Sequence, residues 1–106
     1  MVAMSEIAEF ARRLADEFGP ERIILFGSAA RGEADESSDA DLLVVMPHQG
    51  KSWRAATAIR NRLRPGFALD LIVRSSDELR QRLEMGDPFF KEIVSTGLVL
   101  HEACDG

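Results

Sequence analysis

The sequence predicts an α/β protein in which several helices pack on a small mixed β-sheet. Short runs of β-branched and other apolar residues alternate with longer segments whose apolar residues recur at helical spacing. The length of 106 residues allows one hydrophobic core, and no repeat, low-complexity tract or linker divides the chain. We therefore expect residues 1–106 to form a single domain.

The first half of the chain is expected to contain one helix and two strands. Residues 5–19 have apolar side chains at helical spacing and end in Gly-Pro, which predicts an amphipathic helix. Residues 21–27 (ERIILFG) predict a buried strand, and residues 40–46 (ADLLVVM) predict a strand covered on both faces. Between the strands, residues 28–31 are expected to begin a short helical turn.

The second half is expected to alternate in the same way. Residues 51–66 predict a long helix that ends at Pro-Gly, and residues 67–75 predict a third strand. Ser75 and Glu78 have the spacing of a capping box, which would open a helix that ends at Gly86. Asp-Pro at 87–88 would open another helix, and residues 98–102 (LVLHE) a last edge strand.

Composition excludes several classes of function. The net charge is −5 with no basic tract, which argues against duplex nucleic acid as the main partner. Cys104 is the only cysteine, so a disulfide scaffold and a cysteine-based zinc site are excluded. No apolar run approaches the roughly 20 residues of a membrane span, and no signal peptide is recognisable at the start. We expect a cytoplasmic protein with no membrane association.

Three aspartates are the candidate metal ligands. Asp39 and Asp41 would project from one face of a strand, because side chains alternate with period two. Asp70 lies within the third predicted strand, where a buried unpaired charge would be costly unless Arg74 or backbone donors satisfied it. If the two strands were neighbours, the three acids could hold two divalent cations, an arrangement suited to phosphoryl or nucleotidyl transfer.

Gly27 and Ser28 are the candidate phosphate-binding residues. A glycine directly after a strand lets the backbone turn sharply and approach a ligand. Free N–H groups in the following turn and the Ser28 hydroxyl can bind an anion, and Arg31 is placed to add positive charge. A phosphate turn at one end of residues 27–41 and carboxylates at the other would together form a nucleoside triphosphate site.

Other polar residues favour structural or surface roles. His48 and His101 have no second metal ligand at suitable spacing and are expected at the surface. Trp53 is expected in the core. The arginines of the second predicted helix are expected to form a solvated face, with an acidic partner as the alternative: Arg54, Arg60, Arg62 and Arg64.

The motif resembles that of the nucleotidyltransferase superfamily that includes DNA polymerase β, specifically its minimal nucleotidyltransferase (MNT) branch. The resemblance rests on Gly27-Ser28, ten intervening residues, Asp39-x-Asp41 and an apolar strand, followed by Asp70 in LDLIV, and it spans most of the chain. Many relatives have a basic residue directly after Gly-Ser, where this chain has Ala29.

The resemblance implies a nucleotidyltransferase fold that uses ATP and two magnesium ions held by the three aspartates. One ion would hold the triphosphate and the other would activate an acceptor hydroxyl near Asp70. It also implies a partner, because members of this branch act as antitoxins to HEPN-domain toxins, some by transferring AMP to a partner tyrosine. This chain has no tyrosine, so such transfer would act on another protein. A homo- or hetero-oligomer is compatible with the resemblance.

Three hypotheses follow from the resemblance. The first is a magnesium-dependent protein adenylyltransferase that serves as an antitoxin. The second is a binding antitoxin that blocks its partner by docking, with catalysis incidental. The third is a small-molecule nucleotidyltransferase, which the absence of an acceptor-binding domain within 106 residues disfavours.

Overall fold

The computed structural model describes residues 4–32 and 39–103. The segment 33–38, which lies between the predicted phosphate turn and the Asp39-x-Asp41 motif, and Cys104 lie outside the described residues. The elements follow in the order α1 (Met4–Phe18), β1 (Arg22–Phe26), β2 (Ala40–Val45), α2 (Ser52–Leu63), β3 (Leu69–Arg74), α3 (Ser76–Glu84), α4 (Pro88–Thr96) and β4 (Leu98–Glu102). Each of these elements was predicted from sequence. The short helix expected at 28–31 is instead a hydrogen-bonded turn.

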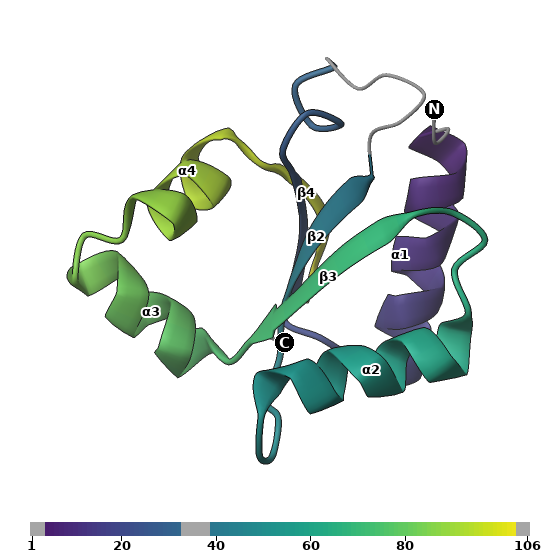
Figure 1. The fold of residues 1–106 in the computed structure, drawn as a ribbon, viewed down its shortest axis with the longest axis horizontal. Helices are drawn as coiled ribbons and strands as arrows, with labels where there is room; N and C mark the ends of the chain where they lie inside the picture. Colours follow the sequence, from purple (N-terminus) through teal and green to yellow (C-terminus); the bar gives the residue numbers. More distant parts are fainter. Residues whose placement is uncertain (1–3, 33–38, 104–106) are drawn as a thin grey trace.

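The strands form one mixed sheet in the order β3-β2-β1-β4 (Figure 1). β1 pairs antiparallel with both β2 and β4, whereas β2 and β3 are parallel. The parallel pair is joined by α2, which crosses one face of the sheet. The adjacency of β2 and β3, on which the metal hypothesis depended, is confirmed.

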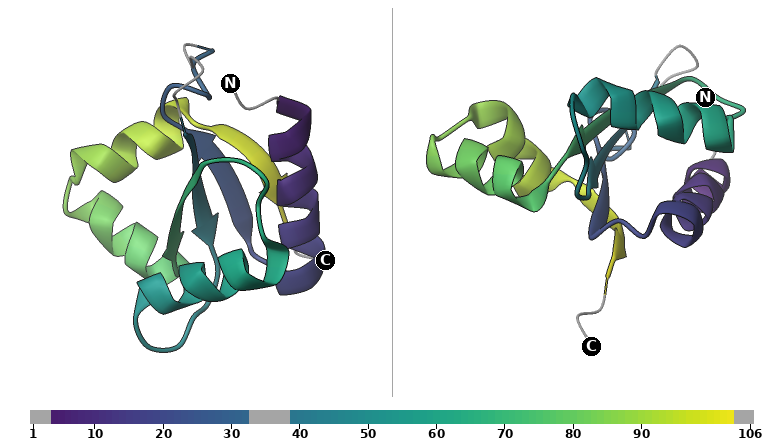
Figure 2. Two further views of the ribbon diagram at one scale, coloured as in Figure 1. Left: turned by 45° about the vertical axis from the view of Figure 1, so that its right-hand side comes forward. Right: turned by 90° about the horizontal axis from the view of Figure 1, so that it is seen from below.

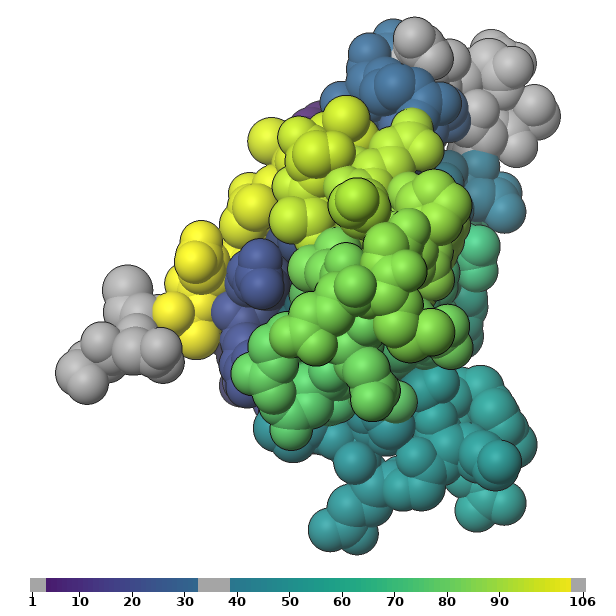
Figure 3. Space-filling model, turned by 90° about the vertical axis from the view of Figure 1, so that its left-hand side faces the viewer, coloured from purple at the N-terminus to yellow at the C-terminus, as the bar shows by residue number. Residues whose placement is uncertain are grey.

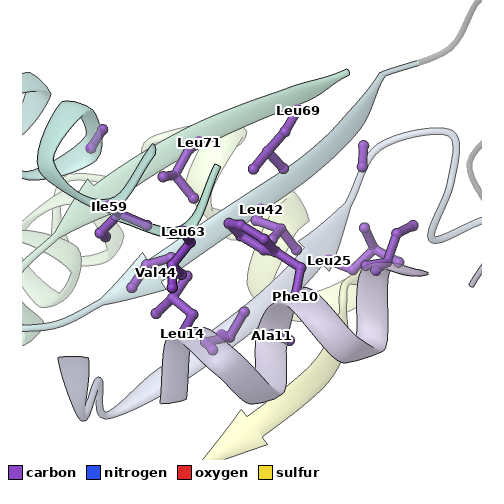
Figure 4. Close-up of a cluster of buried hydrophobic side chains, with 14 of the residues drawn as sticks. Phe10, Ala11, Leu14, Leu25, Leu42, Val44, Ile59, Leu63, Leu69 and Leu71 are labelled. Atoms are coloured by element: carbon purple, nitrogen blue, oxygen red, sulfur yellow. The ribbon is translucent and has the colours of Figure 1, made fainter. Parts of the chain in front are cut away.

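The main core lies between the sheet and the helices α1 and α2 (Figure 2). The apolar face of α1 contributes Phe10 and Leu14, and α2 contributes Ile59 (Figure 4). Alternate residues of the strands, such as Leu42 and Leu71, point to the same side. Burial of these side chains fixes the strand register, because a slip of one residue would turn them to the other face.

The opposite face of the sheet is covered by α3 and α4. Here the intervening strand residues Ile24, Phe26 and Leu43 pack with Phe90 and Ile93 of α4. Both strand faces are therefore buried, as the continuous apolar runs predicted. Figure 3 shows this face, with the turn that follows β1 adjoining α4.

Local signals explain where α3 and α4 begin. Ser75 Oγ accepts from Glu78 N–H at 3.2 Å and Glu78 Oε1 accepts from Ser75 N–H at 2.8 Å, which is the predicted capping box. Asp87 caps α4 by accepting from Phe89 N–H at 3.0 Å, with Pro88 at the first helical position. These caps fix the entry of the two helices that cover the second face.

Three side-chain expectations are wrong. Trp53 is 61% exposed because it lies in the first turn of α2, ahead of the buried positions, with the Arg54 guanidinium 5.4 Å from its ring centroid. The side chain of His48 is only 9% exposed and lies 2.6 Å from Glu78 Oε1. Arg60 does not join a fully solvated face, because its guanidinium donates to the Leu69 carbonyl. His101 is half-buried on β4.

No helix within residues 4–32 and 39–103 combines the length and the apolar character needed to cross a membrane.

Candidate active site

The parallel register of β2 and β3 brings two of the candidate acids together. Asp41 pairs with Asp70 across the two strands. Asp41 shares its sheet face with Leu43, and Asp70 shares the same face with Ile72, so both carboxylates lie on the side covered farther along by α3 and α4. The third acid, Asp39, is exposed and directly precedes β2.

Asp70 is not at the centre of its strand, where the sequence predicts it. It is the second residue of β3 and is exposed at the end of the sheet. Arg74 does not pair with it, because the Arg74 guanidinium donates to Ser52 Oγ at 3.0 Å and to the Val73 carbonyl at 2.7 Å. Within the described part of the chain, Asp70 makes no hydrogen bond or ion pair, so its oxygens are available to a ligand.

Gly27 brings the predicted phosphate-binding turn next to these acids. Phe26 pairs with Asp41 in the antiparallel register, so Gly27 follows directly at the end of β1. Its φ of +77° lies in the left-handed region, and a Cβ built at this position would overlap Asp41 Oδ2 and lie 3.3 Å from Asp41 Cγ. The backbone therefore passes against the carboxylate at a position that only glycine can occupy without strain.

The turn after Gly27 presents backbone donors. Arg31 N–H donates to the carbonyls of Gly27 and Ser28, at 3.3 and 3.2 Å, and closes the turn. Among the described residues, the N–H groups of Ser28, Ala29 and Ala30 have no hydrogen-bond acceptor. Successive free N–H groups in a turn form a concave anion-binding surface. Arg31 itself is exposed beside this turn.

The acids interact electrostatically. Burial raises the pKa of the Asp41 carboxyl above its ordinary value of 3.8, and the neighbouring carboxylates of Asp70 and Asp39 raise the pKa further. Asp41 is thus a carboxylate whose negative charge is unfavourable unless a positive charge lies nearby. A divalent cation would remove this penalty.

The donor set fits a hard cation, although the side chains are not gathered around one point. Carboxylate oxygens are the ligands that magnesium prefers. Within residues 4–32 and 39–103, no group of three or more His, Cys, Asp or Glu side chains is arranged to hold a metal ion. Asp41 and Asp70 are brought together by their register, and Asp39 contributes to the same local field from the start of β2.

Sequence analysis missed the residues of α4 that adjoin the phosphate turn. A cavity of about 180 Å³ is lined by Phe26, Gly27 and Arg31 on one side and by Phe89, Glu92, Ile93 and Thr96 on the other. The α4 residues have positions i, i+3, i+4 and i+7, a helical face visible in the sequence. The sequence did not indicate that this face would lie over β1, because the strand order was unknown.

Comparisons with known proteins agree with this architecture. A crystal structure of a candidate nucleotidyltransferase from Sulfolobus solfataricus has a TM-score of 0.65 and 22% identity, covering 96% of this chain and 82% of that chain. A crystal structure of a toxin–antitoxin with AMP-PNP has a TM-score of 0.57 and 21% identity, covering 96% and 75%. No curated protein sequence gives a significant match.

The family assignment rests on a broader match. The family model described as "Nucleotidyltransferase domain" matches residues 7–100, a range that includes every element from α1 to β4 and all six candidate site residues. Because the model spans most of the chain, the match is not confined to the Gly-Ser and Asp-x-Asp motifs. The chain belongs to the nucleotidyltransferase-domain family.

Proposed function

We propose that this chain is a magnesium-dependent nucleotidyltransferase that transfers AMP from ATP to a hydroxyl group on a partner protein. The observation that carries the proposal is the arrangement around Asp41, which is paired with Asp70 on one side and lies against the Gly27 backbone on the other. A triphosphate bound at the turn would thereby have its α-phosphate close to the carboxylates.

Each residue has a role in this proposal. The free N–H groups of residues 28–30 and the Ser28 hydroxyl bind phosphate oxygens, and Arg31 adds positive charge. Asp39, Asp41 and Asp70 would hold magnesium, which supplies charge neutralisation at the triphosphate. The family membership and the AMP-PNP in the structural neighbour support a nucleotide as the ligand.

The transfer itself exchanges one P–O bond for another. The acceptor hydroxyl oxygen forms a bond to the α-phosphorus, and the bond from that phosphorus to the bridging oxygen breaks, releasing pyrophosphate. Asp70 is exposed at the edge strand β3, where an acceptor can approach, and its carboxylate takes the hydroxyl proton. Positioning and charge neutralisation supply most of the rate enhancement.

We further propose that the acceptor is a toxin protein with a HEPN domain, for which this chain is the antitoxin. The toxin–antitoxin neighbour supports a two-protein system. Exposed apolar side chains on α4 (Val94) and β4 (Leu98 and Val99) support contact with another protein. The same side chains favour one second candidate function, in which the chain blocks its partner by docking without catalysis.

Mass spectrometry distinguishes the two functions. The protein is incubated with ATP, magnesium and the product of the adjacent reading frame. We expect an AMP-sized mass gain on the partner with the unmodified protein and with the control D16N, an exposed acid on α1, but not with D39N or D41N. Inhibition of the partner that persists in D41N without any mass change would favour docking over transfer.

A further inference from the structure

The cavity beside the phosphate turn has the walls of a site for a flat aromatic group. Phe89 is 48% exposed and extends from α4 at the cavity. Its ring lies 5.8 Å from the Phe26 ring, centroid to centroid, at an interplanar angle of 89°, and 5.1 Å from that of Phe90. Phe26 and Phe90 are buried and contact the Phe89 ring in edge-to-face geometry. A partly exposed ring held by such contacts is a suitable platform for stacking.

The polar groups of the cavity are mainly hydrogen-bond acceptors on its α4 side. Glu92 supplies a carboxylate that, among the described residues, has no hydrogen bond or ion pair. The Thr96 hydroxyl already donates to the Glu92 carbonyl at 2.8 Å, so its oxygen remains as an acceptor. A ligand with an amino group on its edge would complement these two oxygens.

The cavity lies on the β1 side of the candidate acids. In the sheet order β3-β2-β1-β4, Asp70 lies on β3, Asp41 on β2 and Gly27 at the end of β1. The cavity is lined by Gly27 and by residues of α4, and in the sheet order β2 with Asp41 lies between β1 and the strand that carries Asp70. The cavity therefore adjoins the turn that would bind phosphates, and its lining does not include the acid that would receive the acceptor.

We propose that this cavity binds the nucleobase of the donor nucleotide, with Phe89 as the stacking platform and Glu92 and Thr96 as acceptors for an exocyclic amino group. The proposal rests on the proposed function, since it takes the turn at 28–30 as the phosphate site. It predicts that nucleotides with an amino-bearing base, such as ATP, bind more tightly than UTP. The cavity volume of about 180 Å³ is enough for a single ring system.

Calorimetric titration with ATP, UTP and inorganic triphosphate in the presence of magnesium tests the inference. Stacking of a base on an aromatic side chain typically changes affinity by about tenfold or more. We expect F89A to weaken ATP binding about tenfold and to leave triphosphate binding unchanged. The control V94A, on the same helix and 41% exposed but outside the cavity, should alter neither. E92Q should reduce the difference in affinity between ATP and UTP, because the glutamine amide can donate a hydrogen bond as well as accept one.

The outcomes separate the base site from the proposed function. If the unaltered protein binds ATP and triphosphate and F89A binds ATP equally well, the base site is wrong and the proposed function stands. If F89A weakens ATP and triphosphate equally, Phe89 supports the phosphate turn and the base site is again wrong. If the unaltered protein binds neither ligand, both proposals are overturned. The melting temperature of each variant is measured to confirm that it is folded.

Discussion

The backbone of Gly27 lies directly against the carboxylate of Asp41, at the point where β1 ends beside β2. A Cβ at residue 27 would occupy the space of Asp41 Oδ2. The phosphate turn and the central acid of the candidate site are therefore in direct contact, and a side chain at residue 27 would require the Asp41 carboxylate to shift.

The first prediction is that G27A destabilises the protein and impairs nucleotide binding. Alanine at φ +77° costs about 1–2 kcal/mol, and the overlap with Asp41 adds to that cost. Urea unfolding should show a loss of about 2 kcal/mol or more, and ATP affinity should fall. The matched control is G86A, because Gly86 has φ +78° and no atom lies within 4 Å of a Cβ built there. G86A should lower the free energy of unfolding only by the cost of the backbone conformation, and its ATP affinity should be unchanged. Equal effects of the two substitutions would show that the contact with Asp41 is unimportant.

The second prediction concerns charge repulsion among the acids. Asp41 pairs with Asp70 across the parallel strands β2 and β3, and like charges that close repel each other and destabilise the folded state. In a chelator at neutral pH, D41N should therefore melt at a higher temperature than the unaltered protein. Added magnesium should raise the melting temperature of the unaltered protein and have little effect on D41N.

The control for this prediction is D16N. Asp16 pairs with Arg12 at 3.1 Å on an exposed helix face, and such pairs contribute little to stability. D16N should leave both the melting temperature and the response to magnesium nearly unchanged. A lower melting temperature for D41N in chelator, or an equal magnesium response in both proteins, would contradict the interpretation of Asp41 as a repelled metal ligand.

Local sequence patterns predicted the helices and strands well, whereas they predicted only some of the contacts between residues far apart in the sequence. The capping box of Ser75 and Glu78 is a local signal and is confirmed. The nearness of Asp70 to Asp41 was expected only if β2 and β3 were neighbours, which the hydrophobic pattern does not decide. Helical periodicity placed Trp53 inward, but it does not reveal where a helix extends beyond the sheet it covers.

Two further features depend on tertiary contacts that leave no pattern in the sequence, and a third depends on a strand boundary. The near-complete burial of His48 follows from its contact with Glu78, which is 30 positions away. The cavity beside Gly27 arises because α4 packs over β1, a contact that helical periodicity does not reveal. Asp70 is exposed because it lies at the start of β3. The predicted strand begins two residues earlier, at residue 67, and therefore placed Asp70 closer to its centre.

The third prediction is a pH dependence of stability through Glu78. Hydrogen bonding from the Ser75 backbone, and then from His48, lowers the pKa of Glu78 below its ordinary value of 4.5. A carboxyl whose folded pKa is lowered contributes stability above its unfolded pKa, and this contribution is lost as the pH falls through the folded value. E78Q should therefore melt at a lower temperature than the unaltered protein at pH 6–7, and the difference should shrink below about pH 4.5.

The magnitude of the Glu78 effect should be small. Its side chain is 42% exposed, so solvent screening keeps the contribution below about 1 kcal/mol. Glutamine keeps the capping geometry and removes the charge. E84Q, an exposed position at the end of the same helix, should show no such difference at any pH. A difference between E78Q and the unaltered protein that stays constant from pH 4 to 7 would show that the charge of Glu78 does not stabilise the fold.

The fourth prediction concerns Gly97, where α4 turns into β4 over β1. A Cβ at this position would overlap the Ile93 carbonyl and lie 2.5 Å from Ile24 Cγ2, so G97A must displace the end of α4 from the sheet. Overpacking of this kind costs about 1–3 kcal/mol. Because Ile93 and Thr96 line the cavity, the displacement should also weaken ATP binding more than triphosphate binding. G66A, with no atom within 4 Å of its Cβ, should change neither stability nor binding. If G97A lowered stability but affected ATP and triphosphate equally, the position of α4 would matter for folding and not for holding the base.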